Sequence, residues 1–435
     1  MKNTYKNQFH LEPEHGLLND PNGLTCYQGK YYFFHQWNRF ETNHCYKAWG
    51  LFTSTDLVHW QNAGPALLPD TATDRDGVYS GSGLVDDDQL WLFYTGNTKP
   101  DGQRKTYQKI AVSQDGRTFV KLDRVYPTPV GYTEHFRDPK VWRQAGRFWC
   151  IIGAQSTQTE GLIHLSSSMN LVDWTDEGVF FKDDTLLQMV ECPDYFETDG
   201  QGVLLCGVQK RSPIDQGDLE FGSRALYWLG SFDPETKQFS PQAAAQPLDD
   251  GWDFYAPQTF KDDQGRQIMT AWMSRMDEDQ EARCPTKQFG YIHCLTFPRE
   301  LHFKNGHLYQ YPVAEIKQLR QKAQTVTGEV TAGQAFELEC LVENQDFTIK
   351  ISDQIAICRQ GSQLQIQRKN WADGTWQEKC LTVDQVAELS IFCDASAAEI
   401  YVNHGQHCFS LRYFTTEETR RITITPTLNS TLYSY

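Results

Sequence analysis

Short apolar runs recur along the first 300 residues, and each follows a small turn rich in Gly, Asp or Gln. The runs are GKYYFFHQW (29–37), QLWLFYTG (89–96), GRFWCIIGA (146–154), GVLLCGV (202–208) and RQIMTAW (266–272). Their starts lie about 55 to 65 residues apart, a period that indicates a repeat architecture in which each repeat is one supersecondary unit.

Two further motifs accompany each apolar run. A strand, a tight turn and a closing aromatic residue follow four of them, as TSTDLVHW (53–60), AVSQDGRTF (111–119), SSSMNLVDW (166–174) and GSFDPETKQF (230–239). A third motif precedes each run, as NDPNGL (19–24), YSGSGLV (79–85), FRDPKVW (136–142), ECPDYF (191–196) and YAPQTF (255–260). Five units with room for about four short strands each predict a five-bladed β-propeller. A βαβ fold would need intervening helices, which the pattern does not contain; a generic β-rich domain is the remaining alternative.

The pattern changes after residue 300. The stretch PVAEIKQLRQKAQ (312–324) predicts one short helix with Pro312 near its start. Period-2 alternation follows, which predicts an antiparallel β-sandwich of roughly 110 residues. Its expected strands are AFELECLV, FTIKISD, AICRQ, QLQIQRK, LSIFCD, AEIYVNHG and RITITPT. We therefore predict an all-β chain with a propeller over 1–308, a short helical linker over 309–325 and a sandwich over 326–435.

Composition and charge narrow the function classes. A hydrophobic content of 39% with 13% aromatic residues is typical of a folded chain. The net charge of −16 argues against a nucleic-acid partner, and an anionic substrate would need a local basic pocket. The chain shows no apolar run of signal-peptide or membrane-spanning length, so we expect a cytoplasmic protein without a membrane partner. Its twelve cysteines are then expected to be reduced, and without CxxC or HExxH motifs we expect neither a metal site nor a cofactor.

Three carboxylates fall on the third motif, which is the candidate for the innermost strand of each blade. Asp20, Asp138 and Glu191 come from the first, third and fourth units, and a propeller brings such positions together around one axis. Each alone is well explained as part of a turn or strand end. Together they suit glycosidic cleavage, in which one acid protonates the leaving oxygen and one carboxylate attacks or stabilises the cationic sugar. A Glu suits the acid role and a short Asp in a turn suits the nucleophile, while Arg137 can keep Asp138 ionised.

The motifs NDPNG (19–23), FRDP (136–139) and EC (191–192), in this order, resemble glycoside hydrolase family 32, which includes invertases, fructanases and sucrose-6-phosphate hydrolases. The likeness extends over nearly the whole chain, through FHQWN (34–38), SGS (80–82), YTGN (94–97), DFYAPQTF (253–260) and AEIYVNHG (398–405). The resemblance implies a five-bladed propeller joined to a β-sandwich, and retaining hydrolysis of β-fructofuranosides.

The resemblance also assigns roles to residues. Asp20 would be the nucleophile that forms a fructosyl-enzyme, and Glu191 the general acid and then base. Asp138 would hold fructose hydroxyls and favour the transition state, with Arg137 beside it. A retaining enzyme is expected to hold the carboxyl groups of its two acids roughly 5–5.5 Å apart. The contacts it suggests to the fructosyl unit are Asn19, Gln36, Trp49, Ser82 and Arg137.

The chain departs from the family pattern near the expected leaving-group site. Leu17 and Leu18 stand where the family often has Trp-Met, and Arg39 stands where it often has Pro. The stretch ETNHCYKAWG (41–50) also lacks the usual His-rich pattern. These differences bear on substrate specificity, and leave the reaction class unchanged.

The leading hypothesis for the substrate is sucrose 6-phosphate, hydrolysed to glucose 6-phosphate and fructose, because sucrose imported by a phosphorylating transporter reaches the cytoplasm in that form. Candidate phosphate contacts at the pocket rim are Arg39, His44 and Lys47, although for any one of them a solvated loop charge is the better explanation. The runner-up is a cytoplasmic β-fructofuranosidase for sucrose or short fructo-oligosaccharides. An inverting hydrolase on a similar propeller and a non-catalytic carbohydrate-binding propeller stay open. The sandwich shows no catalytic cluster, and the chain is expected to be a monomer or homodimer.

Overall fold

The computed structural model describes residues 2–210 and 222–435. The chain forms two compact units. The propeller unit comprises residues 17–248 and 255–271, and the sandwich unit comprises residues 2–16, 249–254 and 272–435.

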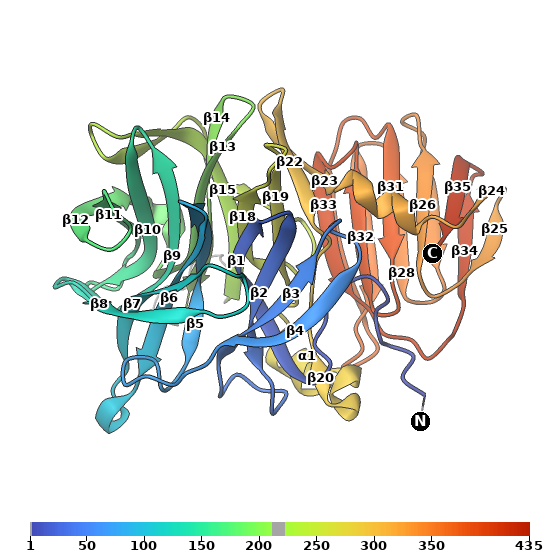
Figure 1. Ribbon diagram of the computed structural model, residues 1–435. Helices are drawn as coiled ribbons and strands as arrows, with labels where there is room; N and C mark the ends of the chain where they lie inside the picture. The colour runs from blue at the N-terminus through green and yellow to red at the C-terminus, as the bar shows by residue number, and fades with distance from the viewer. Residues whose placement is uncertain (1, 211–221) are drawn as a thin grey trace. The chain divides into compact units, whose positions relative to one another are not determined.

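The propeller unit contains a series of antiparallel sheets in which consecutive strands are neighbours (Figure 1). The first sheet has the order β1 (Gly16–Tyr27), β2 (Lys30–Asn38), β3 (Ala48–Ser54), β4 (Trp60–Leu67). The second has β5 (Val78–Asp86), β6 (Gln89–Thr98), β7 (Lys105–Ser113), β8 (Val120–Pro127). The third has β9 (Tyr132–Gln144), β10 (Arg147–Ser156), β11 (Gly161–Ser168), β12 (Trp174–Phe181).

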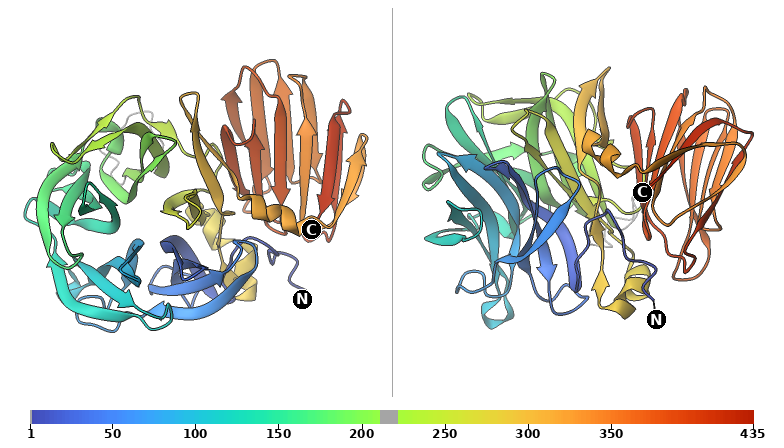
Figure 2. Two further views of the ribbon diagram at one scale, coloured as in Figure 1. Left: turned by 45° about the horizontal axis from the view of Figure 1, so that its top comes forward. Right: turned by 45° about the vertical axis from the view of Figure 1, so that its right-hand side comes forward.

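The fourth sheet consists of β13 (Met189–Thr198), β14 (Gln201–Lys210), β15 (Gly222–Asp233) and β16 (Gln238–Pro241), with β17 (Gln246–Pro247) also paired to β15. The fifth begins with β18 (Tyr255–Lys261) and β19 (Gln267–Met273). The short 3-10 helices η1 (Pro100–Gly102) and η2 (Asp184–Leu186) lie between strands. The left view of Figure 2 shows the sheets of this unit arranged in a ring. Each copy of the third motif lies on the first strand of a sheet, and the predicted five-bladed propeller is confirmed.

The core of the propeller unit lies between neighbouring sheets. The second strands, which carry the apolar runs, are buried along nearly their whole length, whereas the last strands β4 and β8 are largely exposed. One apolar cluster joins Phe34 and Trp49 of the first sheet to Leu92 of the second. Another joins Phe93 of the second sheet to Ile152 of the third. Packing between sheets therefore fixes how the inner strands lie relative to one another.

A buried polar link connects the first strands of three sheets. Lys140 on β9 lies 2.9 Å from Asp194 Oδ2 on β13, and its ammonium also donates to the Thr259 carbonyl on β18, at 2.5 Å. The Thr259 N–H donates to Asp194 Oδ2 as well, at 2.7 Å. Burial raises the pKa of Asp194, against the opposing effect of Lys140. Hydrogen bonds thus tie β9 and β13, which carry Asp138 and Glu191, to each other and to β18.

The sandwich unit contains two six-stranded antiparallel sheets. One has the order β24 (Lys322–Val326), β35 (Asn429–Ser434), β26 (Phe336–Leu341), β31 (Glu388–Cys393), β32 (Ala397–Val402), β33 (His407–Arg412). The other has β25 (Glu329–Ala332), β34 (Arg420–Thr425), β27 (Phe347–Ile351), β28 (Ile355–Gln360), β29 (Gln363–Lys369), β30 (Trp376–Thr382). Alternate residues of both sheets form one apolar core that includes Phe336, Ile349 and Ile391. All seven predicted strands are present, and the sandwich is confirmed.

The helix predicted over 312–324 is much shorter than expected. The structure has a 3-10 helix, η4 (Ala314–Leu319), while Pro312 ends a strand and β24 already begins at Lys322. Its two buried residues, Ile316 and Leu319, are three apart, a spacing that places both on one face of a 3-10 turn. Residues 272–308 belong to the compact sandwich unit. Compactness alone does not define a domain, and the domain boundaries 1–308, 309–325 and 326–435 stay a prediction.

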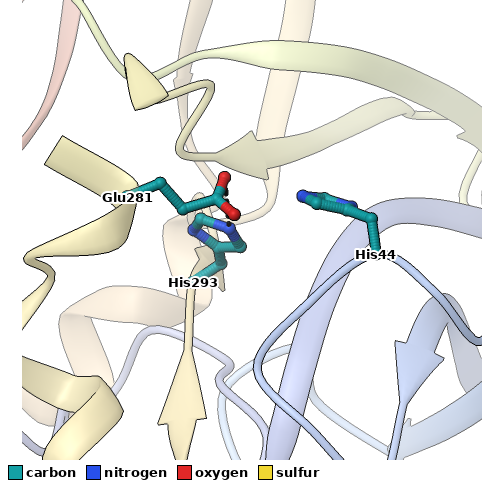
Figure 3. Close-up of side chains that lie close together, drawn as sticks. All are labelled: His44, Glu281 and His293. Carbon is teal, nitrogen blue, oxygen red and sulfur yellow. Dashed lines mark ion pairs between the residues drawn. The ribbon is translucent and has the colours of Figure 1, made fainter. Parts of the chain in front are cut away.

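The remaining elements of the sandwich unit are short: α1 (Glu278–Ala282), η3 (Pro285–Phe289), β20 (Tyr291–Ile292), β21 (Cys294–Leu295), β22 (Arg299–Lys304) and β23 (His307–Pro312). Helix α1 is held by contacts at several points. Glu281 lies 3.7 Å from Nε2 of the buried His293 (Figure 3), and the Trp371 indole donates to the Gln280 carbonyl. Among the described residues, no helix has the length and apolar character needed to cross a membrane.

Candidate active site

The three candidate acids lie where their strands depart from regular pairing. The register of β1 with β2 shifts between Leu18 and Pro21, around Asp20. The pairing of β9 with β10 shifts around Asp138, and that of β13 with β14 shifts just after Glu191. Such bulges bend a strand locally and change the direction of its side chains. The turn-forming residues of the motifs therefore direct the carboxylates out of the regular strand pattern.

The motifs align on a proline, and Glu191 is offset by one residue. Asp20, Asp138 and Cys192 each precede the proline of their motif, whereas Glu191 precedes Cys192. Asp138 and Cys192 have φ of 68° and 46°, a left-handed conformation that costs about 1–3 kcal/mol for residues other than glycine. The expectation that all three acids occupy equivalent positions is therefore wrong for Glu191. At this bulge Cys192 occupies the position equivalent to Asp20 and Asp138, and the residue before it, Glu191, supplies the carboxylate of the site.

Both carboxylate oxygens of Asp20 accept hydrogen bonds from a closed ring of side chains. Asn19 Nδ2 donates to Asp20 Oδ1 (3.0 Å) and to Gln36 Oε1 (3.2 Å). Gln36 Nε2 donates to Ser80 Oγ (2.7 Å), and the Ser80 hydroxyl donates to Asp20 Oδ2 (2.6 Å). Asp20 itself is partly exposed, whereas Asn19, Gln36 and Ser80 are buried. The ring presents a short carboxylate to solvent in a fixed orientation.

Asp138 is buried beside the other two acids. Its Oδ2 accepts the backbone N–H of Cys192 at 2.9 Å, and the Cys192 thiol lies 3.6 Å from that oxygen and 3.9 Å from Asp20 Oδ2. Burial raises the pKa of Asp138 to about 7; Arg137 opposes the rise, and the charges of Glu191 and Asp20 add to it. Cys192 thus joins Asp20 to Asp138, and the proton occupancy of Asp138 changes near neutral pH.

Glu191 is partly exposed and receives donors on both oxygens. Arg137 Nη2 donates to Oε1 at 2.5 Å, and the Tyr255 hydroxyl donates to Oε2 at 2.8 Å. Gln209 also donates to Oε2. Burial would lower the pKa of Arg137, but the carboxylates of Glu191 and Asp138 outweigh it and raise that pKa. The guanidinium therefore stays charged and connects the third and fourth sheets at the acids.

The structure thus brings the three predicted acids into one cluster and places Asn19, Gln36 and Arg137 in contact with them or with each other. Two predicted contacts lie differently. Trp49 is fully buried, donates its indole N–H to the Tyr79 carbonyl and packs between sheets, so its ring presents no face to a sugar. The Ser82 hydroxyl accepts the Val141 N–H, and Ser80, two residues earlier, contacts Asp20 instead.

Sequence reasoning missed four side chains of the cluster. Ser80 lies in the SGS motif, where the bulge between Val78 and Gly81 determines which serine faces the acids. Tyr255 lies in DFYAPQTF, which indicated the fifth blade without indicating a role. Cys192 lies in the motif EC (191–192), which indicated a role for Glu191 alone. Gln209 carries no local motif, and only its pairing opposite Met189, at the start of the strand that bears Glu191, brings it to the site.

The loop after β2 carries the three candidate phosphate contacts. Buried Asn38 holds this loop, since its Nδ2 donates to Asn43 Oδ1 and its Oδ1 accepts the Phe40 N–H. Arg39 lies 4.8 Å above the ring of exposed Phe40, and His44 is exposed. Lys47 differs from the expectation of a residue at the rim: it is buried, donates to Asn19 Oδ1 and lies 3.0 Å from His44 Nδ1.

Comparison with known proteins agrees with this arrangement. Residues 10–312 match the glycosyl hydrolases family 32 N-terminal domain, and residues 314–431 match the glycosyl hydrolases family 32 C terminal. Among relatives, the sucrose-6-phosphate hydrolase of Bacillus subtilis is 37% identical over 433 residues, covering 94% of this chain and 89% of that protein. The sucrose-6-phosphate hydrolase of Klebsiella pneumoniae is 38% identical over 417 residues, covering 94% and 88%.

A solved structure extends the likeness to three dimensions. The sucrose-6-phosphate hydrolase from Lactobacillus gasseri superposes with a TM-score of 0.91 at 30% identity, covering 100% of this chain and 93% of that one. Family matches over both parts of the chain and close relatives over nearly its full length lead to one conclusion. The chain belongs to glycosyl hydrolase family 32.

Proposed function

We propose that this protein is a retaining β-fructofuranosidase that hydrolyses sucrose 6-phosphate to glucose 6-phosphate and fructose. The observation that carries the proposal is the joint arrangement of Asp20, Asp138 and Glu191 around Cys192 and Arg137. It provides the two carboxyl groups that a double displacement at a sugar requires, both partly exposed, and a third carboxyl group that is buried beside them. Sucrose-6-phosphate hydrolases among the relatives support this choice of substrate.

The first half of the reaction forms a covalent intermediate. Asp20, oriented by Asn19 and Ser80, attacks C2 of the fructosyl unit as the C2–O bond to glucose 6-phosphate breaks. Glu191 gives its proton to the departing oxygen. The leaving group departs as neutral alcohol at that oxygen, and Glu191 is left as a carboxylate beside Arg137 and Tyr255.

The second half reverses the proton movement. The Glu191 carboxylate takes a proton from water, whose oxygen attacks C2 and displaces Asp20. Fructose leaves with its original configuration, because C2 has been inverted twice. Asp138 accepts hydrogen bonds from fructose hydroxyls and stabilises positive charge developing on the ring, and Arg137 holds Glu191 in place throughout.

The phosphate group of sucrose 6-phosphate is expected to bind to residues of the loop after β2. The chain has a net charge of −16, so a substrate with a phosphate group gains from cations close to where the leaving group binds. Arg39 supplies such a cation from the held loop, and His44, whose Nδ1 accepts from the Lys47 ammonium, offers its Nε2–H as a donor to the phosphate. Because imported sucrose carries this phosphate inside the cell, we also propose a cytoplasmic location, with a small carbohydrate as the binding partner.

The first test compares kcat/KM for sucrose 6-phosphate, sucrose and 1-kestose with purified protein. The proposal predicts that sucrose 6-phosphate has the highest value. Equal values for sucrose and sucrose 6-phosphate would contradict the proposed preference for the phosphorylated substrate and leave the β-fructofuranosidase activity in place. Absence of hydrolysis of all three would contradict the preference and the activity.

The second test replaces the proposed nucleophile. Asp20→Asn is expected to lower kcat by about 10³-fold or more while leaving the melting temperature nearly unchanged, because the amide cannot attack C2. Asp101→Asn, at an exposed position of η1 in the same unit, is the matched control and should keep full activity. An Asp20→Asn enzyme with wild-type kcat would disprove the assignment.

A further inference from the structure

Lys47 is a buried lysine that contacts Asn19, the residue next to the candidate nucleophile. It precedes β3, is 7% exposed, and donates from its ammonium to Asn19 Oδ1, with His44 Nδ1 at 3.0 Å. Lysine is rarely buried to this degree unless it is paired, because removing an ammonium from water is costly. The contacts of Lys47 with Asn19 and His44, and not exposure of its charge to solvent, therefore explain its position.

The contacts of Lys47 determine the direction of the hydrogen bonds around Asp20. An ammonium only donates, so Asn19 Oδ1 must be the acceptor and Asn19 Nδ2 must face Asp20 Oδ1 and Gln36 Oε1. Gln36 then has its Nε2 toward Ser80 Oγ. That oxygen is occupied as an acceptor, so the Ser80 hydroxyl proton points to Asp20 Oδ2. One donor thus sets the orientation of two amides and one hydroxyl.

We propose that Lys47 is a positioning residue that fixes this ring and, through it, both oxygens of the nucleophile. This inference rests on the proposed function, since it takes Asp20 as the attacking group. Without the ammonium, Asn19 Oδ1 loses its buried donor and the amide is anchored only through Nδ2, so its side chain can leave the orientation that serves Asp20. Asp20 then loses the donor at Oδ1 and moves away from the line of attack on C2.

This role differs measurably from that of a phosphate contact. A group that binds the phosphate stabilises sucrose 6-phosphate in the ground and transition states, and its loss raises KM for that substrate alone. A group that orients the nucleophile affects the chemical step with every fructoside. Loss of Lys47 should therefore lower kcat equally for sucrose 6-phosphate and sucrose and leave both KM values nearly unchanged.

The experiment measures kcat and KM of Lys47→Met, which keeps the length of the side chain and removes the donor. We expect kcat to fall on the order of 10²-fold with both substrates, the loss associated with a misplacement of about 1 Å, and KM to change less than about 3-fold. Lys47→Arg keeps a donor-only cation and should recover part of the loss. Lys182→Met, at a half-exposed lysine of the same unit, is the charge-matched control and should be unchanged.

A double-mutant cycle with Asn19→Ala tests whether Lys47 acts through Asn19. In the Asn19→Ala background, Lys47→Met should lower kcat by no more than about 3-fold further, because the amide that it orients is gone. If kcat of the double variant fell by the product of the two single-variant losses, the proposal would be overturned. The same holds if Lys47→Met changed only KM for sucrose 6-phosphate. If Lys47→Met does not fold, the same cycle with Lys47→Gln, whose amide is uncharged and can accept as well as donate, decides by the same criterion. An active wild type with an inactive Asp20→Asn variant upholds the proposed function whichever way the cycle comes out.

Discussion

Asp138 is the residue at which stability and activity conflict most clearly. It is buried, has a left-handed backbone conformation, and lies close to two other carboxylates. Burial first of all, and then Glu191 and Asp20, raise its pKa to about 7 against the effect of Arg137. An acid whose pKa is higher in the folded state binds its proton more tightly there, so folding stability falls as the pH rises from about 4 through 7.

Asp138→Asn removes this ionisation and keeps the shape of the side chain. The variant should gain stability relative to wild type as pH rises from about 4 to 7.5, by an amount on the order of 4 kcal/mol in the free energy of unfolding. Its activity should fall strongly, because the amide cannot stabilise positive charge on the fructosyl ring. Thermal melts of both proteins across this pH range are the measurement. A constant difference in melting temperature between pH 4 and 7.5 would contradict the account.

Individual site residues were predictable from sequence where a motif and a repeat position coincided. Asp20 and Asp138 met both conditions, whereas Glu191 lies in its motif one residue before the equivalent position. Trp49 and Ser82 lie in motifs too, but which side of a strand faces the axis depends on bulges that the sequence does not reveal, and Ser80 takes the place expected for Ser82. The burial of Lys47 depends on Asn19, a residue 28 positions earlier, and could not be read from its own loop.

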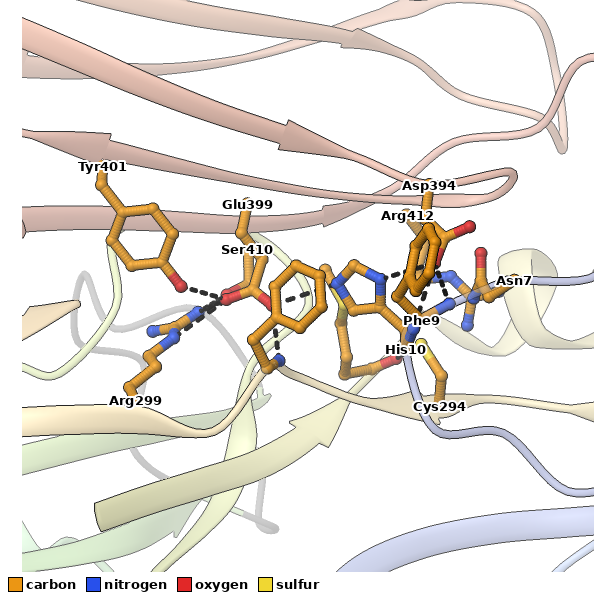
Figure 4. A network of polar contacts seen from close by, with 12 residues as sticks. Asn7, Phe9, His10, Cys294, Arg299, Asp394, Glu399, Tyr401, Ser410 and Arg412 are labelled. Carbon is orange, nitrogen blue, oxygen red and sulfur yellow. Dashed lines mark hydrogen bonds and ion pairs between the residues drawn. The ribbon is translucent and has the colours of Figure 1, made fainter. Parts of the chain in front are cut away.

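At the scale of elements, the N-terminal segment is held in the sandwich unit by buried charges (Figure 4). Asp394, just before β32, accepts the backbone N–H groups of Gln8, Phe9 and His10. The His10 ring lies between Asp394 Oδ2 and Glu399 Oε1, at 3.1 Å from each. Arg299 also donates to Glu399. The segment has little regular structure of its own, so these bonds position it.

His10→Gln tests this attachment. Burial by itself would lower the pKa of His10, but hydrogen bonds and charges from Asp394 and Glu399 raise it to about 9. A raised histidine pKa stabilises the fold fully below about pH 6.5, and this contribution disappears as pH rises through 9. The variant should be destabilised by on the order of 3 kcal/mol near pH 6 and by much less near pH 9.5.

Urea unfolding at the two pH values measures this difference. His302→Gln, at an exposed histidine of the same unit, is the control and should change stability little at either pH. A His10→Gln variant that is equally destabilised at pH 6 and pH 9.5 would show that packing, and not charge, accounts for the role of His10.

Element prediction succeeded where side-chain period dominates. The inner propeller strands and seven sandwich strands follow from apolar runs and from alternation. Several strands that were missed are short or mostly exposed, such as β25 with four residues and β30, whose residues are nowhere fully buried. β33 was missed although five of its six residues are buried. In the predicted helix over 312–324, no residue after Leu319 is buried, and η4 itself has two buried residues, Ile316 and Leu319, enough for a 3-10 turn and too little for a longer helix.

For the whole molecule, the repeat determined what the sequence could reveal. A period near 60 residues implied a ring of sheets, and the ring brought together acids that lie far apart in the chain. The chain has a net charge of −16, so cations close to the acids are important for the local charge balance. Arg137 and Lys47 are two such cations, and both are buried against polar groups of the site. The family of the chain and the geometry of the propeller unit thus support one mechanism.

The most direct measurement of that mechanism is the configuration of the fructose first released. Proton NMR recorded from the first seconds of sucrose 6-phosphate hydrolysis distinguishes the anomers before mutarotation mixes them. Double displacement through Asp20 predicts β-fructofuranose as the initial product, followed by slow equilibration. Initial release of the α-anomer would indicate a single displacement by water and would contradict the assignment of Asp20 as nucleophile.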